Sequence, residues 1–211
     1  MIVTMDGPGG TGKSTVSRVV AQKAGLPHLD TGAFYRAATL AVIESGVDPE
    51  DAEAVVDVVT EVTMDQDDGR MFLDCRDVSS EIRGDDVTSA VSAVSAHPEV
   101  RHALVKLQRA WVERHGGGVI EGRDIGSVVF PDAQIKVYLD AAAEERARRR
   151  SQETGDGVDE VLEDLNRRDR LDSTRQASPL VIPDGAIVID TSDLTLDEVV
   201  DRVLAVIESK S

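Results

Sequence analysis

The sequence is short of cysteine and of basic charge. Cys75 is the only cysteine in 211 residues, so an internal disulfide is impossible, and we interpret Cys75 as a small, half-buried apolar residue. Forty acidic residues against 23 lysines and arginines give a formal net charge of -17. Such a surface repels nucleic-acid backbones and anionic membranes, which argues against binding a nucleic-acid polymer. A small phosphorylated substrate is compatible with this charge only where arginines gather locally.

Long hydrophobic runs are missing as well. The segment 1–5 has no basic region and is too short for a signal peptide, and no stretch reaches the length of a transmembrane helix. We therefore expect a cytoplasmic protein with no membrane partner. Hydrophobic residues still make up 41% of the chain, which predicts one core and a single domain over residues 1–211. No long apolar stripe is left over after core assignment, which predicts a monomer.

Short apolar runs alternate with segments of helical periodicity. The runs lie at 2–5, 119–120, 135–139 and 186–189, and their composition is typical of buried parallel strands. Two apolar stripes at helical spacing lie between runs and are expected to face the core. They are Val100, Leu104, Leu107 and Trp111, and Val158, Val161, Leu162 and Leu165. The alternation predicts an α/β fold with about five parallel strands flanked by helices, and a capping box from Thr195 to Glu198 starts the last helix.

Two segments interrupt this alternation. The stretch from Val62 to Val78 alternates with period two around Asp68-Gly69, which predicts a small antiparallel insert within about residues 60–84. The second segment, from Ser151 to Val158, places two glycines between helical runs and is interpreted as a mobile tip.

A glycine-rich segment follows the first predicted strand and opens the next helix. It matches the P-loop pattern G-x-x-x-x-G-K-[ST], in which backbone N–H groups and the helix N-terminus face phosphate oxygens. Lys13 is expected to reach the β and γ phosphates, and the Ser14 hydroxyl to face Mg²⁺. The alternative is a glycine-rich turn that binds no nucleotide. The pattern predicts ATP or GTP binding by Gly7, Pro8, Gly9, Gly10, Thr11, Gly12, Lys13, Ser14 and Thr15.

Three further segments, taken with this loop, resemble the bacterial cytidylate kinases along nearly the whole chain. They are D-T-G-A-F-Y-R at 30–36, E-G-R-D-I-G at 121–126 and R-D-R-L-D-S-T-R at 168–175. Taken alone, they are also compatible with an N-capped helix start, a structural ion pair and a salt-bridged helix end. The second segment follows a strand, where ligands of open α/β sheets bind. In the third, Arg168, Asp172 and Arg175 fall on one face if the helix continues.

The resemblance implies a P-loop kinase that transfers the γ-phosphoryl group of ATP, with Mg²⁺, to CMP, and to dCMP as a second acceptor. Lys13, Arg123 and Arg168 are implied to surround the transferring group, which needs charge stabilisation rather than a dedicated base. Family members often have Asp where this chain has Glu121, which makes Glu121 a weak candidate. The residues implied to bind CMP are Thr31, Tyr35, Arg36, Ser92, Arg101, Arg123, Asp124, Asp172 and Arg175.

Base selection follows from the polar groups of cytosine. The resemblance places Asp124 with Ser92 at the amino group and Arg101 at the acceptors, which is the pattern that cytosine needs. Uracil has a carbonyl oxygen in place of the amino group, so an ionised Asp124 would be left unpaired, at a cost of about 1 to 3 kcal/mol. We therefore expect discrimination against UMP of about tenfold to a hundredfold.

A second basic group precedes the predicted tip. Arg146, Arg149 and Arg150 are spaced i, i+3 and i+4, as in the lid helix of the family, and are expected to close over the ATP phosphates and exclude water. The alternative is a solvated helix face. The resemblance gives an acceptor-binding region at about residues 31–105 and a lid at about 146–170.

Other functions share parts of this pattern. A GTP-driven switch usually carries the motif N-K-x-D, which binds guanine. The only asparagine, Asn166, is followed by Arg167, which argues against such a switch. Among kinases, UMP, AMP and a small metabolite such as shikimate are the alternative acceptors. A purely regulatory nucleotide-binding module would form no ADP in response to an acceptor.

Overall fold

The chain, seen in a computed structural model that describes residues 1–175 and 177–210, divides into two compact units. One unit comprises residues 1–28 and 117–211, and the other comprises residues 29–116. The predicted lid lies in the first unit, and the predicted acceptor-binding region lies in the second. The single domain over 1–211 stays a prediction. No helix within the described residues is long and apolar enough to cross a bilayer.

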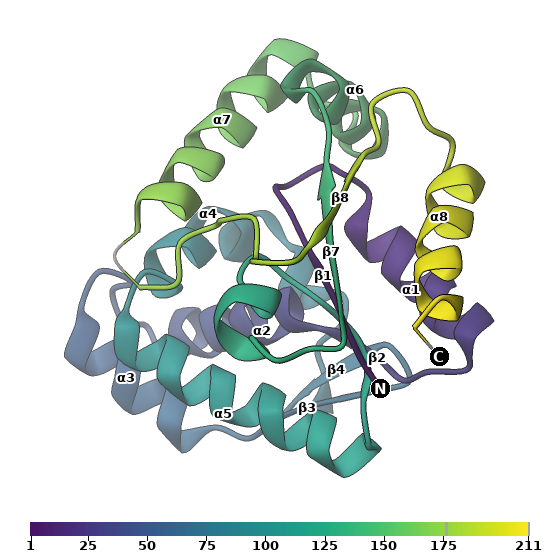
Figure 1. The fold of residues 1–211 in the computed structure, drawn as a ribbon. Coiled ribbons are helices and arrows are strands. Elements are labelled where there is room, and N and C mark those ends of the chain that lie inside the picture. Colours follow the sequence, from purple (N-terminus) through teal and green to yellow (C-terminus); the bar gives the residue numbers. More distant parts are fainter. Residues whose placement is uncertain (176, 211) are drawn as a thin grey trace. The chain divides into compact units, whose positions relative to one another are not determined.

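The first unit contains a parallel sheet with helices between its strands (Figure 1). Its strands are β1 (Ile2–Asp6), β6 (Gly118–Glu121), β7 (Ile135–Asp140) and β8 (Ile187–Asp190), and β2 (His28–Asp30) begins at its boundary. Its helices are α1 (Lys13–Ala24), the short π-helical turn η2 (Ile125–Val129), α6 (Ala143–Thr154), α7 (Val158–Thr174) and α8 (Leu196–Glu208).

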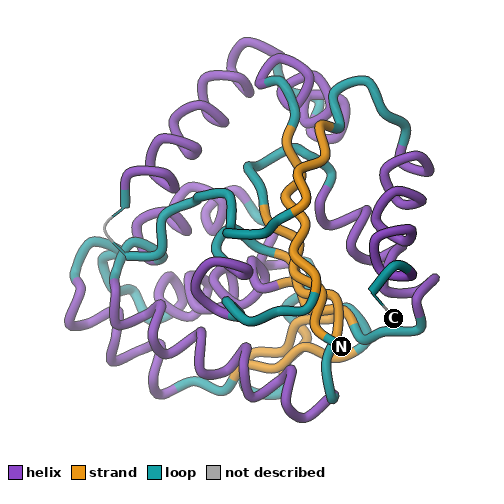
Figure 2. Tube along the Cα trace, viewed as in Figure 1, coloured by secondary structure: helices purple, strands orange, loops and turns teal. Residues whose placement is uncertain are grey.

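The five-stranded sheet has the order β2-β6-β1-β7-β8. β1 pairs in parallel with β6 on one side and with β7 on the other, and β7 pairs in parallel with β8. These strands are among the orange segments of Figure 2, which also colours the strands of the small antiparallel sheet. The predicted α/β fold with about five parallel strands is confirmed. Because β1 is central, the P-loop that follows it leaves the carboxyl edge of the sheet at its middle, where ligands of open α/β sheets bind.

The core of this unit lies between the sheet and two helices. Val3, Val119 and Val137 from the strands pack with Val16 of α1 and Val203 of α8, and α8 lies beside α1 in Figure 1. Thr195 caps α8: its side chain accepts from the Glu198 backbone, and the Glu198 carboxylate accepts from the Thr195 N–H. The predicted capping box is confirmed.

The second unit is mostly helical. Its helices are α2 (Thr31–Glu44), α3 (Ala52–Glu61), the 3₁₀ turn η1 (Glu81–Arg83), α4 (Asp85–Val94) and α5 (Pro98–His115), and its small antiparallel sheet is β3 (Met64–Asp67), β4 (Arg70–Leu73) and β5 (Arg76–Asp77). The predicted antiparallel insert is therefore confirmed, with a third strand added. Cys75 lies in the turn between β4 and β5 and is exposed, so its half-buried assignment is wrong.

Several apolar side chains expected in the core face solvent instead. Leu107 of α5 is 36% exposed and Val158, at the first residue of α7, is 43% exposed. In the same stripes Val100, Leu104, Trp111, Val161 and Leu165 are buried, and Leu162 is half-buried. Val181, Ile182, Ile187 and Val188 are also exposed around the edge strand β8. This cluster removes the ground on which a monomer was expected, and the oligomeric state stays a prediction.

Candidate active site

The P-loop is shaped by glycines that other residues could not replace. Gly10 and Gly12 have φ angles of 79° and 82°, which disfavour residues with a Cβ. A Cβ on Gly7 would lie 2.0 Å from the Leu139 carbonyl oxygen, so the loop passes directly over β7. Gly12 occupies the N-cap of α1, and the first turn contains no acidic residue. The first N–H groups of α1 are therefore left for an anionic ligand.

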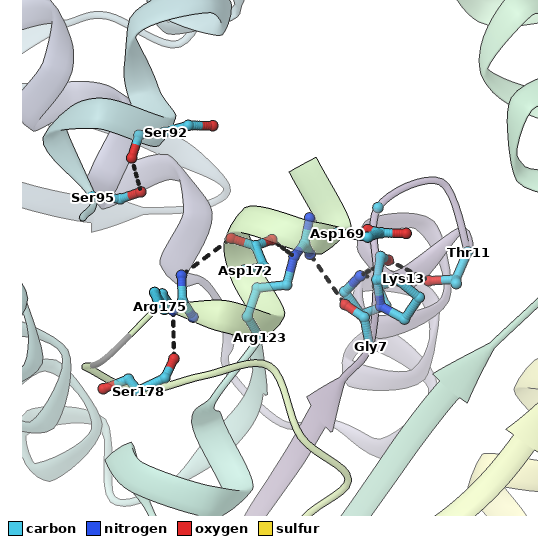
Figure 3. A network of polar contacts seen from close by, with 12 residues as sticks. Gly7, Thr11, Lys13, Ser92, Ser95, Arg123, Asp169, Asp172, Arg175 and Ser178 are labelled. Atoms are coloured by element: carbon cyan, nitrogen blue, oxygen red, sulfur yellow. Dashed lines mark hydrogen bonds and ion pairs between the residues drawn. The ribbon is translucent and has the colours of Figure 1, made fainter. Parts of the chain in front are cut away.

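Lys13 is buried at the start of α1 and folds back over the loop. Its Nζ donates to the Pro8 carbonyl at 2.6 Å and lies 3.4 Å from Thr11 Oγ1 (Figure 3). Burial, followed by the charge of Arg123, lowers the pKa of Lys13 to about 7. A phosphate oxygen in place of the Pro8 carbonyl would favour the charged amine, so this lysine suits a polyanionic ligand.

A hydroxyl and a carboxylate oxygen meet beside Lys13. Ser14 Oγ donates to Glu121 Oε2 at 2.8 Å, and Glu121, the last residue of β6, is 3% exposed. Burial opposes ionisation of Glu121, but the contacts with His28 and Ser14 and the charge of Lys13 outweigh it and lower its pKa. An ionised carboxylate beside a serine hydroxyl fits Mg²⁺, which prefers oxygen ligands and usually takes one or two from protein and the rest from phosphate and water.

Arg123 lies between the P-loop and the end of α7 (Figure 3). Its Nη1 donates to the Gly7 carbonyl at 3.2 Å, and its Nε donates to Asp172 Oδ2 at 3.0 Å. Arg175 Nη1 donates to the other oxygen of Asp172 at 3.2 Å, and its Nε binds the Ser178 carbonyl at 2.5 Å. The structure thus brings Arg123, Asp172 and Arg175 together, and Asp172 bridges the two guanidinium groups.

Arg168 has a different partner. Its Nε pairs with Asp164 Oδ2 at 2.8 Å, one turn back along α7, rather than with Asp172. Burial lowers the pKa of Arg168, with a further contribution from nearby arginines. The helix was predicted to continue through Arg168 and Asp172, and α7 does so. The two side chains nevertheless make separate ion pairs.

The three lid arginines lie in three different environments. Arg146 is buried and donates to the Gly9 carbonyl at 3.0 Å and to Asp169 at 2.7 Å. Arg149 instead donates to the Thr191 carbonyl at 2.6 Å, and Arg150 pairs with Glu153 at 3.0 Å. The structure brings only Arg146 of these three to the P-loop. Spacing places residues on a helix face but does not identify the segment that the face meets. ATP binding by all three stays a prediction.

The second unit holds most of the residues expected at the acceptor. Asp30 accepts from the Ala33 N–H at 3.1 Å and starts α2, which carries Thr31, Tyr35 and Arg36. The Arg36 guanidinium donates to the Ile82 carbonyl at 3.1 Å and to Thr88 Oγ1 at 2.9 Å.

Arg101 of α5 is also buried in this unit. Its guanidinium stacks 5.0 Å from the centre of the Tyr35 ring and donates to the Ser95 carbonyl at 3.3 Å. Ser95 in turn donates to the carbonyl of Ser92 at 3.2 Å, near the end of α4. Tyr35, Arg101 and the segment from Ser92 to Ser95 are therefore linked by direct contacts.

Asp6 is a site residue that the sequence patterns did not identify. This last residue of β1 accepts from the backbone N–H groups of Ile125 and Gly126, both at 2.7 Å, and so anchors the segment after Asp124. Burial raises the pKa of Asp6 to about 6, although these two hydrogen bonds oppose the shift. A Cβ on Gly126 would lie 3.2 Å from Asp6 Oδ2, so the second glycine of the segment E-G-R-D-I-G is a local signal of this close approach.

The family model and the curated relatives agree on one family. A family model described as Cytidylate kinase matches residues 3–209. The chain is 50% identical over 216 residues to a cytidylate kinase of Mycobacterium leprae (strain Br4923), across 100% of this chain and 97% of that one. It is 49% identical over 214 residues to a cytidylate kinase of Caldanaerobacter subterraneus subsp. tengcongensis, across 99% and 95% of the two chains. A solved sugar kinase from Janibacter sp. HTCC2649 has a TM-score of 0.52 at 17% identity, across 98% and 93%, which concerns the fold alone.

Proposed function

Because the chain belongs to the cytidylate kinase family, we propose that it transfers the γ-phosphoryl group of ATP to CMP, with dCMP as a second acceptor. The observation that carries the proposal is the cluster of Lys13, Ser14 and Arg123 around the P-loop. This cluster suits phosphoryl transfer, which depends mainly on alignment and on neutralising charge. The products are CDP or dCDP, and ADP.

The donor phosphates fit the uncapped start of α1. The N–H groups after Gly12 bind the phosphate oxygens, and Lys13 leaves the Pro8 carbonyl to contact the β and γ phosphates. Ser14 and Glu121 would hold Mg²⁺. When bound, this ion neutralises charge on the phosphates and helps to align them. Arg146, fixed to Gly9, supports the loop from the side of α6.

The acceptor phosphate competes with a carboxylate for the same arginine. Asp172 accepts from Arg123 in the structure, and a CMP phosphate carries more charge and more acceptor oxygens than a carboxylate. Arg36, Arg168 and Arg175 complete the cationic set in this proposal. Asp124, which is 3% exposed, accepts from the cytosine amino group, and Ser92 and Arg101 complete base recognition.

The remaining expectations follow from charge and composition. The net charge of -17 argues against a nucleic-acid polymer or an anionic membrane as a partner. We expect a cytoplasmic enzyme that needs only ATP, Mg²⁺ and its nucleotide acceptor.

A coupled assay of ADP formation over several acceptors tests the proposal. With CMP, dCMP, UMP, AMP and shikimate at equal concentration, we expect CMP or dCMP to react fastest and UMP to be about tenfold to a hundredfold poorer in kcat/KM. Asp124→Ala should chiefly lower the ratio of CMP to UMP turnover. Lys13→Ala should remove most turnover with every acceptor.

The control is Asp132→Ala, which removes an exposed carboxylate that follows η2 and should leave both ratio and rate unchanged. An unchanged CMP to UMP ratio in Asp124→Ala would contradict the base-recognition model. ADP formation that does not depend on any of the acceptors would contradict the kinase assignment itself.

A further inference from the structure

A half-buried histidine, absent from the mechanism above, lies behind the P-loop. His28 begins β2, and its side chain is 13% exposed. Its Nε2 lies 2.9 Å from Ser17 Oγ on α1 and 3.3 Å from Glu121 Oε1 at the end of β6. Ser17 is fully buried and Glu121 nearly so. One nitrogen atom therefore contacts two elements of the first unit.

The partners of His28 determine which of its ring nitrogens carries the hydrogen. Ser17 Oγ donates to the Ser14 carbonyl at 3.3 Å, so its oxygen is left to accept. Glu121 Oε2 accepts from Ser14 Oγ, and Oε1, the atom that faces Nε2, is a carboxylate oxygen that accepts in turn. Both partners of Nε2 are acceptors, which assigns the ring hydrogen to Nε2.

Both contacts of His28 lead to the same P-loop residue. Through Ser17, His28 is linked to the backbone carbonyl of Ser14, and through Glu121 it is linked to the Ser14 hydroxyl. The contact of Nε2 with Oε1, at 3.3 Å, orients the carboxylate so that Oε2 faces Ser14 Oγ. Without that donor, Glu121 would be a buried carboxylate with one oxygen less satisfied, free to rotate toward Lys13.

We propose that His28 is a positioning residue that fixes Ser14 and Glu121 in the geometry that receives the metal ion of the metal–nucleotide complex. This inference rests on the proposed function, because it concerns the same donor site. Partners that orient metal ligands from behind typically change metal affinity or activity by about tenfold to a hundredfold when they are removed. The donated hydrogen bond, rather than the ring volume, carries the effect.

The test measures ADP affinity by titration calorimetry in Mg²⁺ and in EDTA. The unmodified protein should bind ADP more tightly in Mg²⁺, and His28→Leu should reduce that Mg²⁺-dependent gain by about tenfold, with affinity in EDTA unchanged. His28→Gln keeps an N–H donor at a similar reach and should retain most of the gain. His102→Gln, at an exposed position on α5, is the matched control and should behave as the unmodified protein.

The inference would be overturned by no Mg²⁺-dependent gain in the unmodified protein, by an equal gain in His28→Leu, or by an equal loss of ADP affinity in Mg²⁺ and in EDTA in that variant. A Gln variant as poor as the Leu variant would also overturn it. If circular dichroism shows that His28→Leu does not fold, Ser17→Ala removes the other contact and must itself lower the gain. CMP turnover by the unmodified protein tests the proposed function separately, because the ADP titrations need no acceptor.

Discussion

Asp6 shows how a single buried carboxylate can hold a functional segment in place. Its two oxygens accept from Ile125 and Gly126, and these residues directly follow Asp124, which is proposed to recognise the base. Burial favours the neutral form of Asp6, and the nearby charge of Asp124 adds to this effect. Asp6 therefore anchors the segment that follows Asp124, although burial makes the ionised form of Asp6 unfavourable.

The pH dependence of stability should report this carboxylate. The pKa of Asp6 is about 6 in the folded protein against an ordinary value of 3.8, so the folded state binds the proton more tightly than the unfolded state. Stability from this group is therefore highest below about pH 4 and falls as pH rises to about 6, by about 3 kcal/mol in all. We expect Asp6→Asn to remove this decline in urea unfolding between about pH 4.5 and about pH 7.5.

Asp132→Asn provides the control for this measurement. Asp132 is exposed, so its replacement should leave the pH profile of the unmodified protein in place. A profile in Asp6→Asn that still declines to the same extent would mean that other groups cause the loss.

Among single residues, the sequence predicted those that belong to a local motif. Lys13 and Ser14 were found because the P-loop motif fixes their backbone and their neighbours. Asp6 and His28 were missed because their partners, Gly126 and Glu121, lie about a hundred residues away in the chain. Strand order decides such contacts, and spacing along the sequence contains no information on it.

Among the elements, α6 and the P-loop make a close contact through one glycine. A Cβ on Gly10 would lie 3.0 Å from Arg146 Cβ and 3.2 Å from the Arg146 carbonyl oxygen, and the φ of Gly10 is 79°. The Arg146 side chain meanwhile binds the Gly9 carbonyl. The position of α6 and the shape of the loop therefore depend on each other.

A comparison of Gly10→Ala with Gly25→Ala should separate the effect of backbone strain from the effect of displacing the P-loop from α6. Gly25, which ends α1, has a φ of 66°, and a Cβ there would meet no described atom within 4 Å. Both Gly25→Ala and Gly10→Ala should lower the free energy of unfolding by about 1 to 2 kcal/mol through the left-handed backbone. Only Gly10→Ala should also raise KM for ATP, by about tenfold, because it displaces the loop from α6.

Urea unfolding and steady-state kinetics on the same preparations give both quantities. If KM for ATP rose equally in the two variants, general loss of stability would explain the effect. An unchanged KM in Gly10→Ala would show that α6 moves without disturbing the loop.

The sequence predicted elements well where one segment contains the whole signal. The capping box of α8 and the turn around Asp68-Gly69 are local, and both were confirmed. Leu107 and Val158 were placed in the core wrongly because periodicity defines a stripe but not where the neighbouring element ends. Arg149 was expected at the phosphates from helix spacing as well; in the structure its guanidinium binds the Thr191 carbonyl, and its role in ATP binding stays a prediction.

The charge of the whole molecule is at odds with its proposed ligands, and local arrangement resolves this. The chain carries a net charge of -17, yet Lys13, Arg123 and Arg146 are buried or half-buried at the P-loop of the first unit. Exposed pairs such as Arg76 with Glu44 contribute little to stability, because solvent screens them. The unbalanced acidic surface, rather than individual ion pairs, should therefore dominate the response of the fold to salt.

Added salt should stabilise this protein. Repulsion between the excess acidic groups weakens as the Debye length falls from about 30 Å at 0.01 M to about 8 Å at 0.15 M, so the free energy of unfolding should rise over that interval. The rise should then level off, because little repulsion is left to screen, whereas stabilisation by excluded salts continues to grow with concentration. Urea unfolding in a NaCl series measures both parts of the curve. A free energy that falls over the first interval would mean that favourable ion pairs outweigh the net repulsion between the acidic groups.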